Sequence, residues 1–190
     1  MKDIIERSIK ESIRAHEGLL KDEVANNIEK AARVMIKSLR LGGKLLIFGN
    51  GGSAADSQHM AAELVGRFKK DRRALAAIAL TANTSILTAI GNDYGYDATF
   101  ARQVSAHGKK GDVAIGISTS GNSANVLNAV QEAKSLDMST ISLTGCDGGR
   151  LGKACDISII VRTDETPRVQ EAHITIIHIL CDLIEKDIFK

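Results

Sequence analysis

Five short segments of the sequence are apolar almost without interruption, and this pattern constrains the fold more than any other feature. They are residues 44–48, 74–80, 112–118, 139–144 and 156–161. A strand with one face in water alternates apolar and polar side chains, whereas a strand covered on both faces is apolar throughout. The five segments therefore predict buried strands whose sheet has helices on both faces.

Segments with helical character separate these predicted strands. They are residues 53–67, 97–107, 122–135 and a short segment near 149–154. Strand and helix in alternation are typical of a parallel sheet, because each parallel pair needs a crossover connection. The sequence thus predicts an α/β fold with three layers, in which a doubly wound, five-stranded parallel sheet of the flavodoxin-like type is flanked by helices.

A helical arm of about 40 residues precedes the first predicted strand. Apolar residues recur at four-residue steps from Ile5 to Ile13, and a second apolar stripe runs from Val24 to Leu39. The arm has little of its own domain to pack on, so we expect it to bind other subunits. A long helix predicted over residues 167–187 is apolar nearly all round, which also indicates an oligomer.

Composition excludes several functional classes. The 190 residues suit one domain, with the arm at 1–40 and an α/β core at 41–190. The net charge is only +2 and the charges alternate, so nothing indicates nucleic acid as a partner. No apolar segment approaches the ~20 residues of a membrane span, and the charged first residues are unlike a secretory signal. Three cysteines in apolar surroundings argue against a disulfide scaffold, so we expect a cytoplasmic protein.

Two loops rich in glycine and serine follow the first and third predicted strands, at Gly49–Ser53 and Ser118–Ser123. Ligands of such sheets bind beyond the carboxyl ends of the strands, and a helix start suits a phosphate. Neither loop has a P-loop lysine or the G-x-G-x-x-G spacing, so a small phosphate ester is favoured over a nucleotide. For either loop alone, the alternative is that Ser53 and Asn122 simply cap helices.

Two further groups of polar residues could carry chemistry. His59 and Glu63 share one helical face, as two ligands of one metal ion or an acid–base pair would, but so would a solvated surface pair. His178 lies among aliphatic residues and is either a structural histidine or a general acid–base. Eight residues of helix separate Gln170 from His178 by about 12 Å. If both serve one site, we expect them to come from different subunits.

Four segments together resemble a known family, in order and in spacing. They are GNGGSAADSQHMAAEL (49–64), LTAIGNDYGYD (87–97), GISTSGNSANV (116–126) and RVQEAHITIIHIL (168–180). The chain resembles the sugar isomerase (SIS) domain family, and within it most closely the isomerases of sedoheptulose 7-phosphate. One departure is Thr166-Pro167 before Arg168, where relatives often have an acidic or small residue.

The resemblance implies a homotetramer of the bacterial cytoplasm, with active sites between subunits and one zinc ion per subunit. It would convert D-sedoheptulose 7-phosphate into D-glycero-D-manno-heptose 7-phosphate, the first step toward activated heptoses for lipopolysaccharide or other surface glycans. The residues matched to sugar contacts are Asn50, Gly51, Gly52, Asn92 and Asp93, with Glu63 and Gln170 also at the substrate. Those matched to phosphate contacts are Ser53, Ser118, Thr119, Ser120 and Ser123. Those matched to zinc ligands are His59, Glu63, Gln170 and His178.

Isomerisation through an enediol needs a base and an acid, and we assign these roles to Glu63 and His178 without deciding which is which. Zinc bound by both would leave neither wholly free to carry protons, so its ligation is either loose or mainly orders the pocket. The alternatives are another phosphosugar isomerase, or a non-catalytic SIS regulator such as a DnaA initiator-associating protein or a sugar-phosphate sensor. That regulator family lacks the Glu63 and His178 equivalents, which favours an enzyme here.

Overall fold

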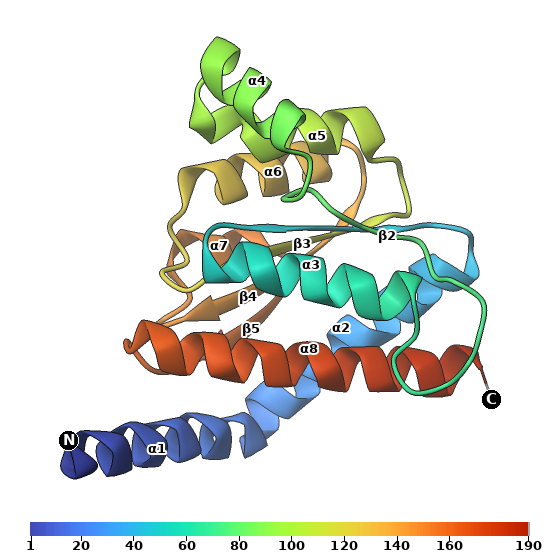
Figure 1. The fold of residues 1–190 in the computed structure, drawn as a ribbon. Helices are drawn as coiled ribbons and strands as arrows, with labels where there is room; N and C mark the ends of the chain where they lie inside the picture. Colours follow the sequence, from blue (N-terminus) through green and yellow to red (C-terminus); the bar gives the residue numbers. More distant parts are fainter. Residues whose placement is uncertain (190) are drawn as a thin grey trace.

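The computed structural model describes residues 1–189 and has one five-stranded parallel sheet in the order β2-β1-β3-β4-β5 (Figure 1). The strands are β1 (Leu45–Gly49), β2 (Ala77–Ala79), β3 (Val113–Ser118), β4 (Ser139–Gly145) and β5 (Ile157–Val161). The predicted doubly wound α/β fold is confirmed. From β1 the chain first adds β2 on one side and then continues with β3, β4 and β5 on the other side. Parallel sheets open a crevice for ligands at such a switch point, which here lies between β1 and β3.

Helices cover both faces of the sheet, as the apolar strands require. The helices are α1 (Lys2–Glu17), α2 (Asp22–Arg40), α3 (Gly52–Val65), α4 (Thr84–Tyr94), α5 (Thr99–His107), α6 (Ala124–Ser135), α7 (Gly149–Ala154) and α8 (Thr166–Ile188), with short 3₁₀ turns η1 (Gly18–Leu20) and η2 (Tyr96–Ala98). Alternate residues of β1 enter two separate cores. Ile47 packs in the core that α2, α3 and α8 cover, and Phe48 packs in the core of α5, α6 and α7.

Two predicted elements differ from the observed ones. β2 is shorter than the predicted strand 74–80, because it is an edge strand that pairs only with β1 over three residues. Helix α4 lies in a segment where we predicted no helix, and none of its residues is buried. It projects from the body of the domain beyond α5 and α6 (Figure 1).

The helical arm is α1, η1 and α2, and the 3₁₀ turn η1 that begins at Gly18 interrupts its two helices. In the isolated chain α1 leaves four isoleucines more than half exposed: Ile4, Ile5, Ile9 and Ile13. The three cysteines are free. Cys146 is exposed, whereas we expected all three to lie in apolar surroundings. Among residues 1–189, no helix combines the length and the apolar character that crossing a membrane would require.

Candidate active site

The two helices that carry the predicted chemical groups, α3 and α8, lie side by side and run in the same direction (Figure 1). They are parallel because each begins at the carboxyl end of a strand of the same parallel sheet. Gln170, near the start of α8, packs against Gly52, the first residue of α3. A Cβ at residue 52 would overlap the Gln170 amide, so the glycine leaves room for this amide at the start of α3.

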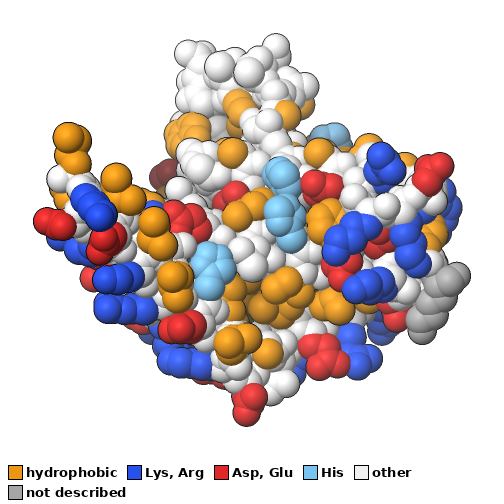
Figure 2. All heavy atoms as spheres, turned by 60° about the horizontal axis from the view of Figure 1, so that its bottom comes forward, with side chains coloured by type: hydrophobic (Ala, Val, Ile, Leu, Met, Phe, Trp, Pro, Cys, Tyr) orange, Lys and Arg blue, Asp and Glu red, His pale blue; other side chains and the backbone are white. Residues whose placement is uncertain are grey.

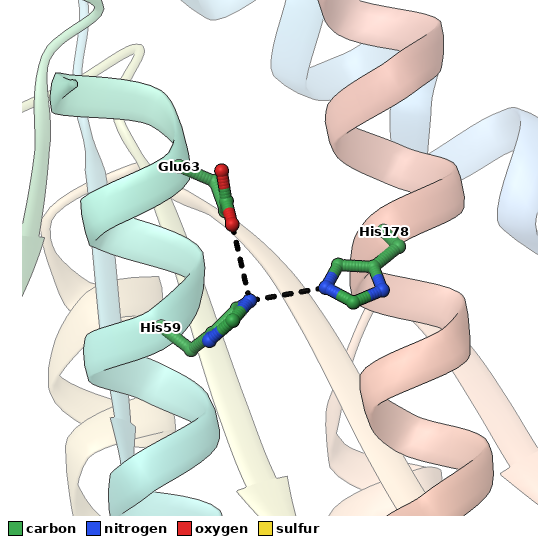
Figure 3. A group of neighbouring side chains, drawn as sticks. All are labelled: His59, Glu63 and His178. Carbon is green, nitrogen blue, oxygen red and sulfur yellow. Dashed lines mark hydrogen bonds and ion pairs between the residues drawn. The ribbon is translucent and has the colours of Figure 1, made fainter. Parts of the chain in front are cut away.

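Two turns further along the same pair of helices, three of the predicted residues meet (Figure 3). His59 Nε2 lies 3.0 Å from His178 Nε2 and 3.2 Å from Glu63 Oε1. The ligand atoms of these three residues all lie within 4.8 Å of one another. The His59 side chain is 45% exposed and that of Glu63 is 23% exposed, so the group can be reached from solvent. Figure 2 shows histidine side chains at the surface of this face, beside apolar side chains.

The donor set of this cluster fits a zinc ion. Two histidine nitrogens and one carboxylate oxygen match a zinc site that keeps a fourth position open. At Zn–N distances of about 2.0–2.1 Å, tetrahedral ligands place two nitrogens about 3.3 Å apart, close to the 3.0 Å between His59 and His178. Gln170, the fourth predicted ligand, packs instead at the start of α3, about 10 Å along that helix from His59.

Serine hydroxyls gather in the loop after β3. Ser118 Oγ lies 2.9 Å from Ser123 Oγ and 3.5 Å from Ser120 Oγ. The backbone N–H of Asn122 donates to Ser120 Oγ at 3.2 Å, and Thr119 lies within the same turn. These hydroxyls lie just before the start of α6, and hydroxyl groups beside a helix start suit a phosphate.

The loop after β1 lies next to this serine loop, because β1 and β3 are neighbours in the sheet. Ser53 is buried in the first turn of α3, and its backbone N–H donates to the Asn50 carbonyl at 3.0 Å. Gly51 is exposed. The structure thus brings the predicted sugar and phosphate loops to one edge of the sheet.

Asn125 connects the two loops, and our sequence analysis missed it. The side-chain amides of Asn50 and Asn125 exchange two hydrogen bonds of 2.9 Å, and Tyr96 donates to Asn50 Oδ1 at 3.1 Å. Asn125 is only 3% exposed. The sequence signal was the asparagine just inside the helix that follows the serine loop.

Asn92 and Asp93 lie on the projecting helix α4 (Figure 1). Both are exposed, and Asn92 Nδ2 donates to Asp93 Oδ1 at 2.8 Å. Within residues 1–189, no hydrogen bond links them to another predicted site residue. Their role in sugar binding stays a prediction.

Asp56 is a second residue that the sequence analysis missed. It lies one turn before His59 on α3, and its buried Oδ2 has no hydrogen-bond partner within the described part of the chain. Burial raises the pKa of Asp56 to about 6, although neighbouring His59 opposes this shift. A carboxyl group of this kind can exchange a proton near neutral pH.

The fold and these loops define a class of protein. A family model described as the SIS domain matches residues 10–145, which is most of the chain. The architecture and the loops after β1 and β3 are those expected from the resemblance to that family. The chain is therefore an SIS-domain protein.

Comparison with individual proteins narrows the class. The chain is 55% identical to a phosphoheptose isomerase of Clostridium acetobutylicum over 190 residues, covering 100% of this chain and 97% of that one. It is 60% identical to a phosphoheptose isomerase of Helicobacter hepaticus over 160 residues, covering 84% and 82%. A solved phosphoheptose isomerase from Neisseria gonorrhoeae superposes with a TM-score of 0.92 at 47% identity, covering 97% and 98%. The chain belongs to the phosphoheptose isomerase family.

Proposed function

We propose that this protein interconverts D-sedoheptulose 7-phosphate and D-glycero-D-manno-heptose 7-phosphate by way of an enediol. The observation that carries the proposal is the cluster of His59, Glu63 and His178 on the face formed by α3 and α8. The hydroxyl-rich loops lie at the sheet edge from which α3 begins. Identity above 50% to phosphoheptose isomerases along the whole chain supports the same substrate.

Isomerisation moves a carbonyl from C2 to C1, so one group must remove the C1 proton and another must deliver a proton at C2 or its oxygen. We assign this pair of roles to Glu63 and His178, which contribute a carboxylate and an imidazole from two different helices. The proton on the carbon next to a carbonyl is only weakly acidic, so a base held close to that proton greatly increases the rate of its removal. His59, in contact with both, orients the two groups.

Zinc is the metal that we propose for this cluster, held by His59, Glu63 and His178, with Gln170 as a further candidate ligand. When bound, zinc would act as a Lewis acid that polarises the substrate carbonyl. The serine loop binds the phosphate through Ser118, Thr119, Ser120 and Ser123, together with Ser53. This remote binding energy holds the reacting carbons at the cluster.

We further propose a homotetramer of the bacterial cytoplasm, whose active sites are completed between subunits and whose product feeds surface glycan synthesis. The exposed isoleucines of α1 support association, as do Ile179 and Leu183 on α8, which are 39% and 37% exposed in the isolated chain. Apolar surface of this extent is typically covered in an assembly.

Purified protein incubated with sedoheptulose 7-phosphate tests the proposal. We expect the aldose to appear, and a chelator to slow its formation. The His178→Ala variant should lose at least about 100-fold in kcat while keeping the oligomeric state. Binding of the sugar phosphate without any turnover would instead support a non-catalytic sensor and would refute the proposal.

A further inference from the structure

A buried carboxylate on α8 receives an unusual number of hydrogen bonds from one short segment. Glu185 lies two turns beyond His178, and its side chain is 3% exposed. Its carboxylate accepts the backbone N–H groups of Phe68 (3.2 Å), Lys69 (3.0 Å) and Lys70 (2.8 Å), and the Nε–H of Arg72 (3.2 Å). Burial opposes ionisation of Glu185, but these donors outweigh it and hold its pKa below the usual value. All four donors come from the segment that follows α3.

Arg72, the side-chain donor to Glu185, also binds the end of α3. Its side chain is 2% exposed. One guanidinium nitrogen, Nη2, donates to the Glu63 carbonyl at 2.8 Å, and the other, Nη1, donates to the Leu64 carbonyl at 2.7 Å. These carbonyls belong to the last turn of α3, where helices leave such groups without an internal partner. Arg72 and Glu185 together join the end of α3 to α8.

Arg72 and the segment bound by Glu185 each contact the candidate active site. Arg72 binds the backbone of Glu63 itself. The segment held by Glu185 also presents Phe68, whose ring lies beside the His178 ring with centroids 5.7 Å apart. The pair and its segment thus touch the backbone of Glu63 on one helix and the ring of His178 on the other.

A buried ion pair seldom adds more stability than apolar side chains of the same volume would. Its advantage is directional, because an arginine fork fixes several oxygens at once. Reacting groups must be held to about 0.5 Å, and a shift of about 1 Å can cost about 100-fold in rate. We propose that Arg72 and Glu185 are positioning residues that hold Glu63 and His178 at their working separation. This inference rests on the proposed function.

Two variants test the inference, and the chain offers a matched control. Glu185→Gln keeps the volume and removes the charge, while Arg72→Lys keeps the charge and loses the fork. The control is Asp112→Asn. Asp112 is another fully buried carboxylate, which accepts the backbone N–H groups of Lys44 and Lys109 and pairs with the Lys44 ammonium. Asp112 directly precedes β3 and so lies at the amino ends of the strands, on the opposite side of the sheet from the candidate active site.

We expect all three variants to lower the midpoint of thermal unfolding. Only Glu185→Gln and Arg72→Lys should also lower kcat, by about 10- to 100-fold, with KM changed less than about threefold. The same two should weaken Zn²⁺ binding to metal-free protein about tenfold or more in calorimetry, a measurement that needs no turnover. If Glu185→Gln fails to fold, Arg72→Lys decides the outcome.

The inference is overturned if kcat and Zn²⁺ affinity per folded protein stay unchanged in these variants, or if Asp112→Asn loses them equally. Failure of the proposed function has a different signature. The wild-type protein would then leave sedoheptulose 7-phosphate unconverted, while the Zn²⁺ titrations would still report whether the pair positions the cluster.

Discussion

His173 is fully buried on α8, and its Nε2–H donates to the Thr144 carbonyl at 3.2 Å. Burial lowers the pKa of His173 to about 4, although the Thr144 bond opposes the shift. An unfolded histidine has a pKa near 6.5, so between about pH 6.5 and 4 the unfolded state binds more protons than the folded state. The stability that the neutral imidazole contributes is thus complete above that window and falls as the pH drops through it, by up to about 1.4 kcal/mol per pH unit.

We predict that His173→Gln flattens this dependence, because the amide can still donate to Thr144 but does not titrate. Urea unfolding at pH 7, 6 and 5 measures the effect. The other histidines are common to both proteins and cancel in the difference. Equal pH slopes for variant and wild type would contradict the assignment.

Ser120 belongs to the proposed phosphate loop and is exposed. A hydrogen bond to a charged group contributes about 1.5–3 kcal/mol, so Ser120→Ala should raise KM about tenfold or more and change kcat less. Steady-state kinetics with the sugar phosphate measure this split. Ser135→Ala is the matched control, since within residues 1–189 its hydroxyl donates only to the Glu132 carbonyl near the end of α6. A KM equal to the wild-type value in Ser120→Ala would remove this hydroxyl from phosphate binding.

The individual site residues could be predicted from the sequence only where local spacing carried the signal. His59 and Glu63 are one helical turn apart, so their proximity follows from the helix alone. That His178 meets them depends on the packing of α3 against α8, and here the sequence analysis relied on resemblance. Asp56 was missed because only the folded structure shows that its carboxylate oxygen is buried without a partner. Asn125 was missed because its contact with Asn50 joins two loops that are far apart in the sequence.

At the scale of elements, the loop after β3 interlocks with the turn before α7. Gly121 has φ +65°, and a Cβ there would overlap the Gly148 carbonyl. We predict that Gly121→Ala lowers the free energy of unfolding by about 2 kcal/mol or more and weakens sugar phosphate binding, because the serine loop must move.

Thermal unfolding and KM together measure this effect. Gly18→Ala is the control, since Gly18 has φ −60° and nothing within 4 Å of a Cβ. A Gly121→Ala protein with wild-type stability and KM would contradict the described contact.

The elements themselves could be predicted where apolar residues were continuous or recurred on one face. β1 and β3 lie within one residue of their predicted bounds. A strand covered on both faces is apolar along its whole length, so its ends are marked by the change to polar residues or glycine. Helix α4 buries none of its residues in the isolated chain, so no core-facing stripe marked it. Its remaining signal was Asn83, whose side chain caps the helix by accepting the Ile86 N–H.

At the scale of the whole molecule, α1 exposes an apolar face in the isolated chain, and the proposed assembly would cover it. Ile9 is 55% exposed on that face, whereas neighbouring Lys10 points to solvent near Glu6. We predict that Ile9→Glu lowers the mass of the assembly measured by light scattering, because the charge would be buried between subunits. Lys10→Glu should leave the mass unchanged. An Ile9→Glu protein with the wild-type mass would show that α1 is not an interface.

Proton NMR in deuterium oxide tests the central claim most directly, since the claim is that Glu63 and His178 move a proton between two carbons of a seven-carbon sugar phosphate. With wild-type protein and sedoheptulose 7-phosphate, we predict that aldose signals grow while deuterium enters at C1 of the ketose or C2 of the aldose. Glu63→Gln should slow both at least about 100-fold. Exchange and turnover at the wild-type rate in Glu63→Gln, or neither in the wild-type protein, would contradict the account.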